Sequence, residues 1–165
     1  MRILGIIVVF IGSIISGCAT TNTSTVAVTS EKPSLSLSQE ETWNLMIGKW
    51  YGSQPTKDGG KKQEIVERSP QGTYKITFRI YDKDGKLKEQ SEAGHWGVSG
   101  PVYFTIFRGW IEGNQFSPSN PADPYNYDAY RIIKLNDEVF EYENYSSGNK
   151  YVIKRAPNDF QFPNE

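Results

Sequence analysis

The sequence predicts an all-β domain: a single antiparallel up-and-down β-barrel of about eight strands, with a short N-terminal helix. Two observations support this fold class. From residue 50 onward, short runs rich in β-branched and aromatic residues alternate with turn signals built from Gly, Asp, Asn and Ser. The 165-residue chain shows no internal repeat and no second core. Eight short strands joined mostly by tight turns are typical of such a barrel.

The N-terminal segment has the layout of an export signal. Arg2 makes a positive start, an apolar run covers residues 3–15, and small residues lead into Cys18. This run is too short to span a bilayer comfortably. The stretch Ile15-Ser16-Gly17-Cys18 resembles the signal of bacterial lipoproteins, which is cut before the cysteine. The resemblance implies removal of residues 1–17 and attachment of acyl chains, such as palmitate, at Cys18.

A transmembrane helix and an ordinary secretory signal are the alternatives for this segment. Cys18 favours the lipoprotein signal, because it is the only cysteine of the chain and stands where that pattern requires it. Ala19, rather than Asp, follows the cysteine, and in the lipoprotein family this favours transfer to the outer membrane. We therefore expect a lipid-anchored protein of the cell envelope, on the outer membrane and facing the periplasm, with the bilayer as partner through Cys18.

Residues 18–37 are rich in Ser and Thr and have no helical or strand periodicity. Such a stretch buries too little apolar surface to offset its ordering entropy, so it is predicted to be a flexible tether to a domain at residues 38–165. Eighteen basic and nineteen acidic residues argue against nucleic acid as a partner. With one cysteine and one histidine, no disulfide, metal site or cofactor is expected in the domain.

The domain begins with a helix signal. Ser38 is a suitable N-cap with Glu41 three residues later, which is the pattern of a capping box, and Gly48 follows the apolar positions. A short helix is therefore predicted at residues 39–47. The predicted strands open at Trp50-Tyr51 and continue at 63–67, 73–81, 86–96, 102–108, 127–135, 138–145 and 150–155.

Gly48-Lys49-Trp50-Tyr51, directly after the helix, is similar to the Gly-x-Trp motif that opens the first strand of lipocalins and their calycin relatives. The resemblance implies an eight-stranded barrel in which Trp50 lies across the closed end. It also implies that a basic residue of the last strand, here Arg155, packs over that ring by a cation–π contact. The alternative is that Trp50 is an ordinary core residue at the start of a strand.

Alternation predicts which side chains face the barrel interior. Tyr74, Ile76, Phe78 and Ile80 share the apolar face of one strand. A two- or four-residue turn within residues 82–85 then pairs even positions of this strand with odd positions of the next; only an odd-length loop or a bulge would reverse this. The inward residues of the next strand are therefore predicted to be Leu87, Glu89, Ser91, Ala93 and His95.

These positions suggest a binding pocket in the barrel, with candidate ligand-binding residues Tyr74, Phe78, Glu89, Ser91 and His95. Two alternatives compete. Glu89 and His95 face solvent if the register differs, or Glu89 orients His95 as a general base. No serine or cysteine nucleophile motif and no second histidine accompany them, so an enzyme is not expected.

The connection between the strands at 102–108 and 127–135 is unusually long and holds Trp110, Phe116 and three prolines. We interpret residues 109–126 as a lid over the barrel mouth or a contact surface for another protein. A loop packed on the outside of the barrel is the alternative.

Together, these features predict a membrane-anchored, lipocalin-like lipoprotein that binds a small apolar or amphipathic ligand inside its barrel. The alternative function is a protein-interaction module of the cell envelope that acts through residues 109–126. Such a module would be an assembly factor or an inhibitor of a cell-wall-degrading enzyme.

Overall fold

The computed structural model describes residues 36–163. The predicted signal peptide, Cys18 and nearly all of the predicted tether lie outside the described residues. Within them, no helix combines the length and the apolar character needed to cross a bilayer.

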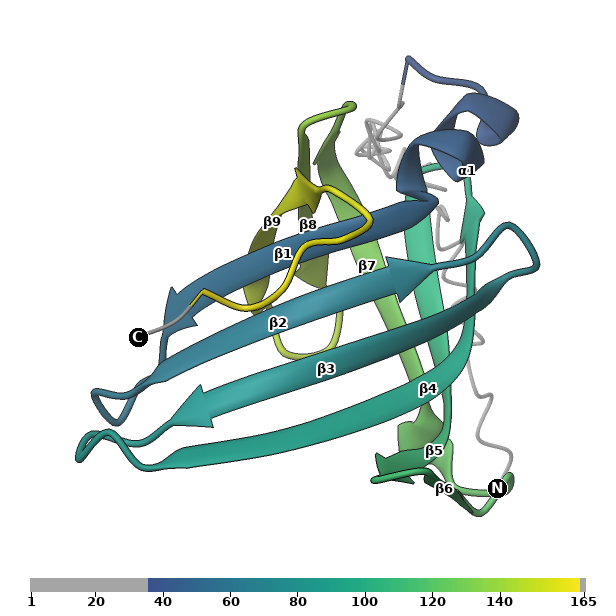
Figure 1. The fold of residues 1–165 in the computed structure, drawn as a ribbon. Helices are drawn as coiled ribbons and strands as arrows, with labels where there is room; N and C mark the ends of the chain where they lie inside the picture. The colour runs from purple at the N-terminus through teal and green to yellow at the C-terminus, as the bar shows by residue number, and fades with distance from the viewer. Residues whose placement is uncertain (1–35, 164–165) are drawn as a thin grey trace, which may run out of the picture. The chain divides into compact units, whose positions relative to one another are not determined.

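Eight antiparallel strands close into a barrel, as the sequence predicts (Figure 1). With one further short strand, the sheet has nine: β1 (Gly48–Pro55), β2 (Lys61–Arg68), β3 (Thr73–Tyr81), β4 (Leu87–Ser99), β5 (Val102–Glu112), β6 (Gln115–Pro118), β7 (Tyr127–Leu135), β8 (Val139–Asn144) and β9 (Lys150–Ala156). Neighbours in the chain pair in turn, β5 pairs with both β4 and β7, and β9 pairs back with β1. The short β6 lies outside the ring and pairs only with the end of β5.

The helix α1 (Gln39–Met46) precedes the barrel and lies at one of its ends (Figure 1). Its start is the predicted capping box: the Glu41 backbone N–H donates to Ser38 Oγ at 3.1 Å, and the Ser38 N–H donates to Glu41 Oε2 at 2.8 Å. These bonds satisfy two backbone donors that a helix start would otherwise leave without partners. The helix ends one residue earlier than predicted.

The core lies at the end of the barrel that α1 covers, which we call the closed end. Met46, Trp50 and Phe140 are completely buried there. The Trp50 indole N–H donates to the Met46 carbonyl at 3.0 Å, which satisfies its only polar group. Trp43 of the helix stacks on Trp96 of β4 with 4.2 Å between ring centroids. The helix therefore closes the barrel with aromatic rings rather than with a loop.

Arg155 of β9 lies over the closed end. Its guanidinium carbon is 3.9 Å from the centroid of the Trp50 ring, which is the cation–π geometry that the family resemblance implies. The same guanidinium donates to the carbonyls of Leu45 and Ile47, at the C-terminal end of α1. A cation is favoured at this end of a helix dipole. Burial, followed by the nearby Arg68, lowers the pKa of Arg155.

The predicted pairing of β3 with β4 is wrong by one residue. Tyr81 pairs with Leu87, and the Asp82 N–H donates to the Lys86 carbonyl, so the connecting loop has an odd number of residues. Gly85 adopts a φ of 80°, and Asp82 Oδ1 accepts bonds from the N–H groups of Asp84 and Lys86. Even positions of β3 therefore pair with even positions of β4, and the face assigned to β4 is reversed.

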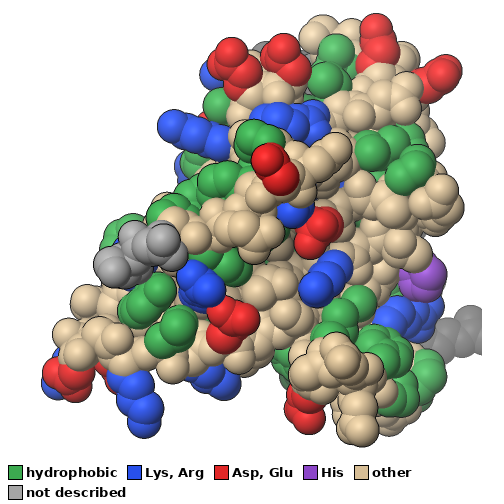
Figure 2. Space-filling view, in the orientation of Figure 1, with side chains coloured by type: hydrophobic (Ala, Val, Ile, Leu, Met, Phe, Trp, Pro, Cys, Tyr) green, Lys and Arg blue, Asp and Glu red, His purple; other side chains and the backbone are tan. Residues whose placement is uncertain are grey.

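Glu89, Ser91 and His95 consequently do not point into the barrel, and Leu87 and Ala93 share their outward face. Glu89 Oε2 accepts from Arg79 Nε at 2.8 Å on the outer surface. Ser91 Oγ is hydrogen-bonded to Thr77 Oγ1 at 3.0 Å. His95 is exposed, and Figure 2 shows the histidine, in purple, on the surface.

The predicted long loop at 109–126 is mostly ordered structure. Residues 109–112 belong to β5, and β6 folds back on them as a hairpin. A 3-10 turn, η1 (Pro124–Asn126), then leads into β7.

Candidate functional site

The half of the barrel away from α1 contains a cavity of about 390 Å³. Its walls come from every strand of the ring except β1, together with η1 and the residue before it. The lining residues are Lys62, Glu64, Tyr74, Ile76, Phe78, Glu92, Tyr103, Thr105, Phe107, Trp110, Asp123, Tyr125, Asn126, Asp128, Tyr130, Tyr142 and Tyr151. Ligand pockets in proteins typically have volumes of about 300–1,000 Å³.

Strand alternation explains which residues reach the cavity. On β2, β3 and β4 the even-numbered residues face inward, because Glu64 pairs with Phe78 and Ile76 pairs with Glu92. The structure places two of the candidate ligand-binding residues, Tyr74 and Phe78, in the cavity wall.

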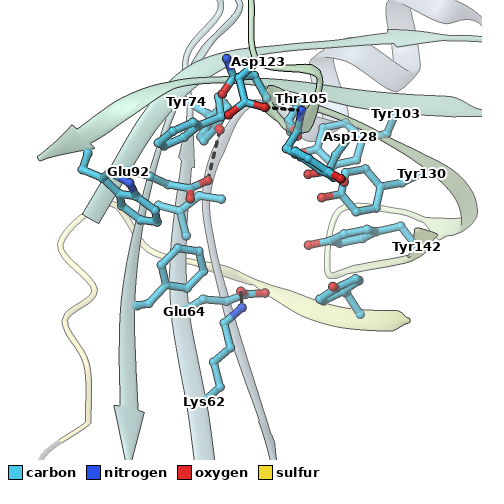
Figure 3. Close-up of a pocket in the computed structure, with 17 residues that line it drawn as sticks. Lys62, Glu64, Tyr74, Glu92, Tyr103, Thr105, Asp123, Asp128, Tyr130 and Tyr142 are labelled. Atoms are coloured by element: carbon cyan, nitrogen blue, oxygen red, sulfur yellow. Dashed lines mark hydrogen bonds and ion pairs between the residues drawn. The ribbon is translucent and has the colours of Figure 1, made fainter. Parts of the chain in front are cut away.

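One wall of the cavity is made of tyrosines from β5, β7, β8 and β9. Tyr103 stacks on Tyr130 with 5.1 Å between ring centroids, and Tyr142 stacks on Tyr151 at the same distance. In Figure 3 the labelled hydroxyls of this wall point into the open space. Burial raises the pKa of Tyr103, Tyr130 and Tyr142, so these phenols remain neutral donors and acceptors.

Glu92 of β4 lies on the opposite wall, where it accepts a hydrogen bond of 3.1 Å from the Tyr74 hydroxyl (Figure 3). Gly94 makes this contact possible, because a Cβ at Gly94 would lie 2.7 Å from the Tyr74 ring. Burial raises the pKa of Glu92, while the bond from Tyr74 and the charge of Lys62 act in the opposite direction. The result is a carboxyl group that is costly to ionise unless a positive charge lies nearby.

Three further carboxylates border the cavity. Glu64 lies 3.5 Å from Lys62 Nζ, and this ammonium also lies 4.3 Å from the centroid of the Phe78 ring. Asp128 Oδ1 accepts from Asn144 Nδ2 at 2.9 Å, and Asp123 accepts from the Tyr125 N–H at 2.9 Å. The lining thus has four carboxylates and one ammonium group.

Arg68 separates the cavity from the closed end. It is 3 % exposed, its Nη2 donates to the Tyr103 hydroxyl at 3.0 Å, and its guanidinium carbon lies 5.3 Å from the centroid of the Phe140 ring. Its Nε and Nη1 have no hydrogen-bond partner among the described residues. Arg68 does not line the cavity itself.

The two aromatic residues predicted for a lid or partner contact lie in different places. Trp110 borders the cavity and packs against Phe107 with 5.0 Å between ring centroids. Phe116 lies on β6 opposite Ile111, is 53 % exposed and does not line the cavity.

The general-base arrangement is not formed. Glu89 pairs with Arg79 and His95 pairs with Thr73, so the two side chains lie six residues apart on β4, roughly 20 Å along the strand. Across residues 36–163, no group of three or more His, Cys, Asp or Glu side chains is arranged to hold a metal ion.

Sequence reasoning missed Glu64, Glu92 and Asp128. Glu92 follows Ser91, which was predicted to face inward. The connection at residues 82–86 has an odd number of residues, and this length places Glu92 inside and Ser91 outside. Glu64 could have been found from the alternation of Glu64, Val66 and Arg68 on β2, which places a carboxylate on the face of the buried Val66.

No protein-family model matches this sequence, and no curated protein matches it. Among solved structures, the chain is similar to a lipocalin-like protein from Bacteroides uniformis, with 17 % sequence identity and a TM-score of 0.42. The match covers 68 % of this chain and 99 % of that protein.

Proposed function

We propose that this protein is a lipid-anchored lipoprotein of the cell envelope whose lipocalin-like barrel binds a small amphipathic molecule. The observation that carries the proposal is the cavity of about 390 Å³ inside the closed ring of strands. The lipoprotein-like pattern that ends at Cys18 supports the anchor, and Ala19 after it supports the outer-membrane location.

The lining favours an amphipathic ligand over a purely apolar one. Ile76, Phe78 and Phe107 offer apolar contact, but carboxylates and tyrosine hydroxyls face the same space. A purely apolar occupant would leave these polar groups without partners, which costs free energy for each group. A ligand with one polar end and an apolar body meets both parts of the wall.

The experiment uses the full-length chain expressed in a Gram-negative bacterium and purified from its membranes without added ligand. The protein is denatured in organic solvent, and released small molecules are identified by mass spectrometry. We expect an amphipathic compound from the wild type and none from Ile76→Trp, whose ring would fill the cavity. Lys75→Trp is the matched control, since its side chain lies on the other face of the same strand, and it should retain the compound.

Cys18→Ser is expressed in parallel and should move the protein from the membrane to the soluble fraction. The absence of any released compound from the wild type, or equal amounts from Ile76→Trp, would contradict ligand binding in the barrel. Membrane association of Cys18→Ser would contradict the lipid anchor.

A further inference from the structure

We propose that the ligand of this cavity is an organic cation: an amine or quaternary ammonium group on an apolar body, held by Glu92, Asp128 and the tyrosine hydroxyls. This inference rests on the proposed function, because it names the chemical class of the molecule that the barrel binds.

The charge of the lining is the first argument. Burial raises the pKa of Glu92, and the charges of Glu64 and Asp128 raise it further by like-charge repulsion. Lys62 is the one cation of the lining, and it is already engaged with Glu64 and with the Phe78 ring. A cationic group that entered between Glu92 and Asp128 would relieve this repulsion.

The aromatic wall is the second argument. Tyr103, Tyr130 and Tyr142 point their hydroxyls into the space that the carboxylates border (Figure 3), and Tyr151 lines the same space. The stacked rings turn their hydroxyl edges to the cavity, and hydroxyl oxygens accept hydrogen bonds from ammonium groups. The combination of carboxylates and hydroxyl acceptors therefore suits a cation better than it suits a neutral or anionic group.

Tyr142 supplies an independent sign of a polar occupant. Its side chain is 6 % exposed and its ring is held between Phe140 and Tyr151. Its hydroxyl points into the cavity and makes no hydrogen bond with any other residue that the structure describes (Figure 3). The side chain is held in place while its hydroxyl is open to the cavity, so this group is available to a polar ligand.

An anionic ligand would require an accessible positive charge. Arg68 lies behind Tyr103, outside the lining, with one of its N–H groups donating to that phenol. The apolar end of the ligand has a separate place, since Ile76, Phe107 and Trp110 border the cavity.

The test compares three probes with the same decyl chain by calorimetric titration of the full-length protein at neutral pH, below their micelle concentrations: decyltrimethylammonium, 1-decanol and decanoate. We expect a Kd for the cation at least about tenfold lower than for decanol, with decanoate binding most weakly. Equal or tighter binding of decanol or decanoate would overturn the inference. So would failure of all three to bind. If the cation inference is overturned, the proposed function still stands as long as the wild type releases a compound in the extraction experiment. It fails only if the wild type releases none.

Two glutamates on the same strand provide the decisive variants. Glu92→Gln should raise the Kd of the cation about tenfold and leave that of decanol unchanged. Glu89→Gln is the matched control, since it makes the same chemical change on the outer face of β4, and it should change neither Kd. If Glu92→Gln does not fold, Asp128→Asn tests the same site. Unchanged cation binding in either folded variant, Glu92→Gln or Asp128→Asn, would overturn the assignment of the charged end.

Discussion

The two ends of this barrel are built from the same strands but have opposite chemistry. At the closed end, Met46, Trp50 and Phe140 are completely buried, and the cation of Arg155 is balanced by a ring face and by helix carbonyls. At the other end, which we call the open end, the same strands carry three carboxylates and a wall of tyrosines around a cavity, and Asp123 before η1 adds a fourth carboxylate. The difference indicates that the closed end supplies most of the stability and leaves the open end free to keep polar groups for recognition.

The largest expected effect comes from removing the central ring of the closed end. Trp50→Ala should lower the free energy of unfolding by about 3–5 kcal/mol, because it deletes a completely buried ring and leaves a cavity. It also removes the cation–π partner of Arg155. Denaturant unfolding followed by circular dichroism measures the loss.

Tyr142→Phe is the matched change at the open end. It keeps the ring and its stacking on Tyr151 and removes only a hydroxyl that has no partner among the described residues. Its effect on the free energy of unfolding should stay below about 1 kcal/mol. If both variants lost similar stability, the proposed division between the two ends would be wrong.

The second prediction concerns Glu92 and pH. Burial raises its pKa above the ordinary value of 4.5, so the folded protein holds this proton at a pH where the unfolded chain has released it. Stability attributable to Glu92 therefore falls as the pH rises from about the ordinary value through the raised one. The groups that act on Glu92 are Tyr74 on β3, Lys62 and Glu64 on β2, and Asp128 on β7.

Glu92→Gln should accordingly unfold at the same temperature as the wild type or at a higher one at pH 7. This gain in stability should disappear as the pH approaches the range in which carboxyl groups ordinarily titrate. At every pH the change in the free energy of unfolding should stay within about 1 kcal/mol, since Gln can still accept a hydrogen bond from Tyr74. Thermal unfolding of both proteins across this pH range is the measurement. A loss of stability at pH 7 that exceeds the loss at acid pH would show that ionised Glu92 stabilises the fold.

The sequence was sufficient to predict the fold but not the residues that line the cavity. The predicted strands at 73–81 and 127–135 match β3 and β7 at both ends, and the capping box is present at Ser38 and Glu41. These features depend on local patterns. β6 was missed because Gln115–Pro118 is short, has no alternating pattern and pairs only with the end of β5.

The prediction of the site depended on the length of the loop between β3 and β4. Alternation on β4 leaves two faces that could point into the barrel. Both carry polar residues, Glu89 and Ser91 on one and Gln90 and Glu92 on the other, so the residue types do not distinguish them. In a barrel with a solid core, apolar residues would mark the inward face, but a polar cavity removes this mark. Only the length of the turn at residues 82–86 decides the register, and the pattern of the turn residues allowed more than one length.

The smallest expected effect tests this register directly. Glu89 and Arg79 form an ion pair of 2.8 Å, and their side chains are 50 % and 29 % exposed. Solvent and salt screen such pairs, so Glu89→Gln should cost less than about 0.5 kcal/mol, and added salt should abolish the difference. The Arg79 guanidinium keeps a second contact, 4.6 Å from the centroid of the Phe162 ring, which limits the loss further. A glutamate that faced the barrel interior would instead respond to pH as Glu92 does and would not respond to salt. A pH-dependent, salt-insensitive change in Glu89→Gln would therefore restore the inward placement of Glu89 and contradict the pairing of β3 with β4 described above.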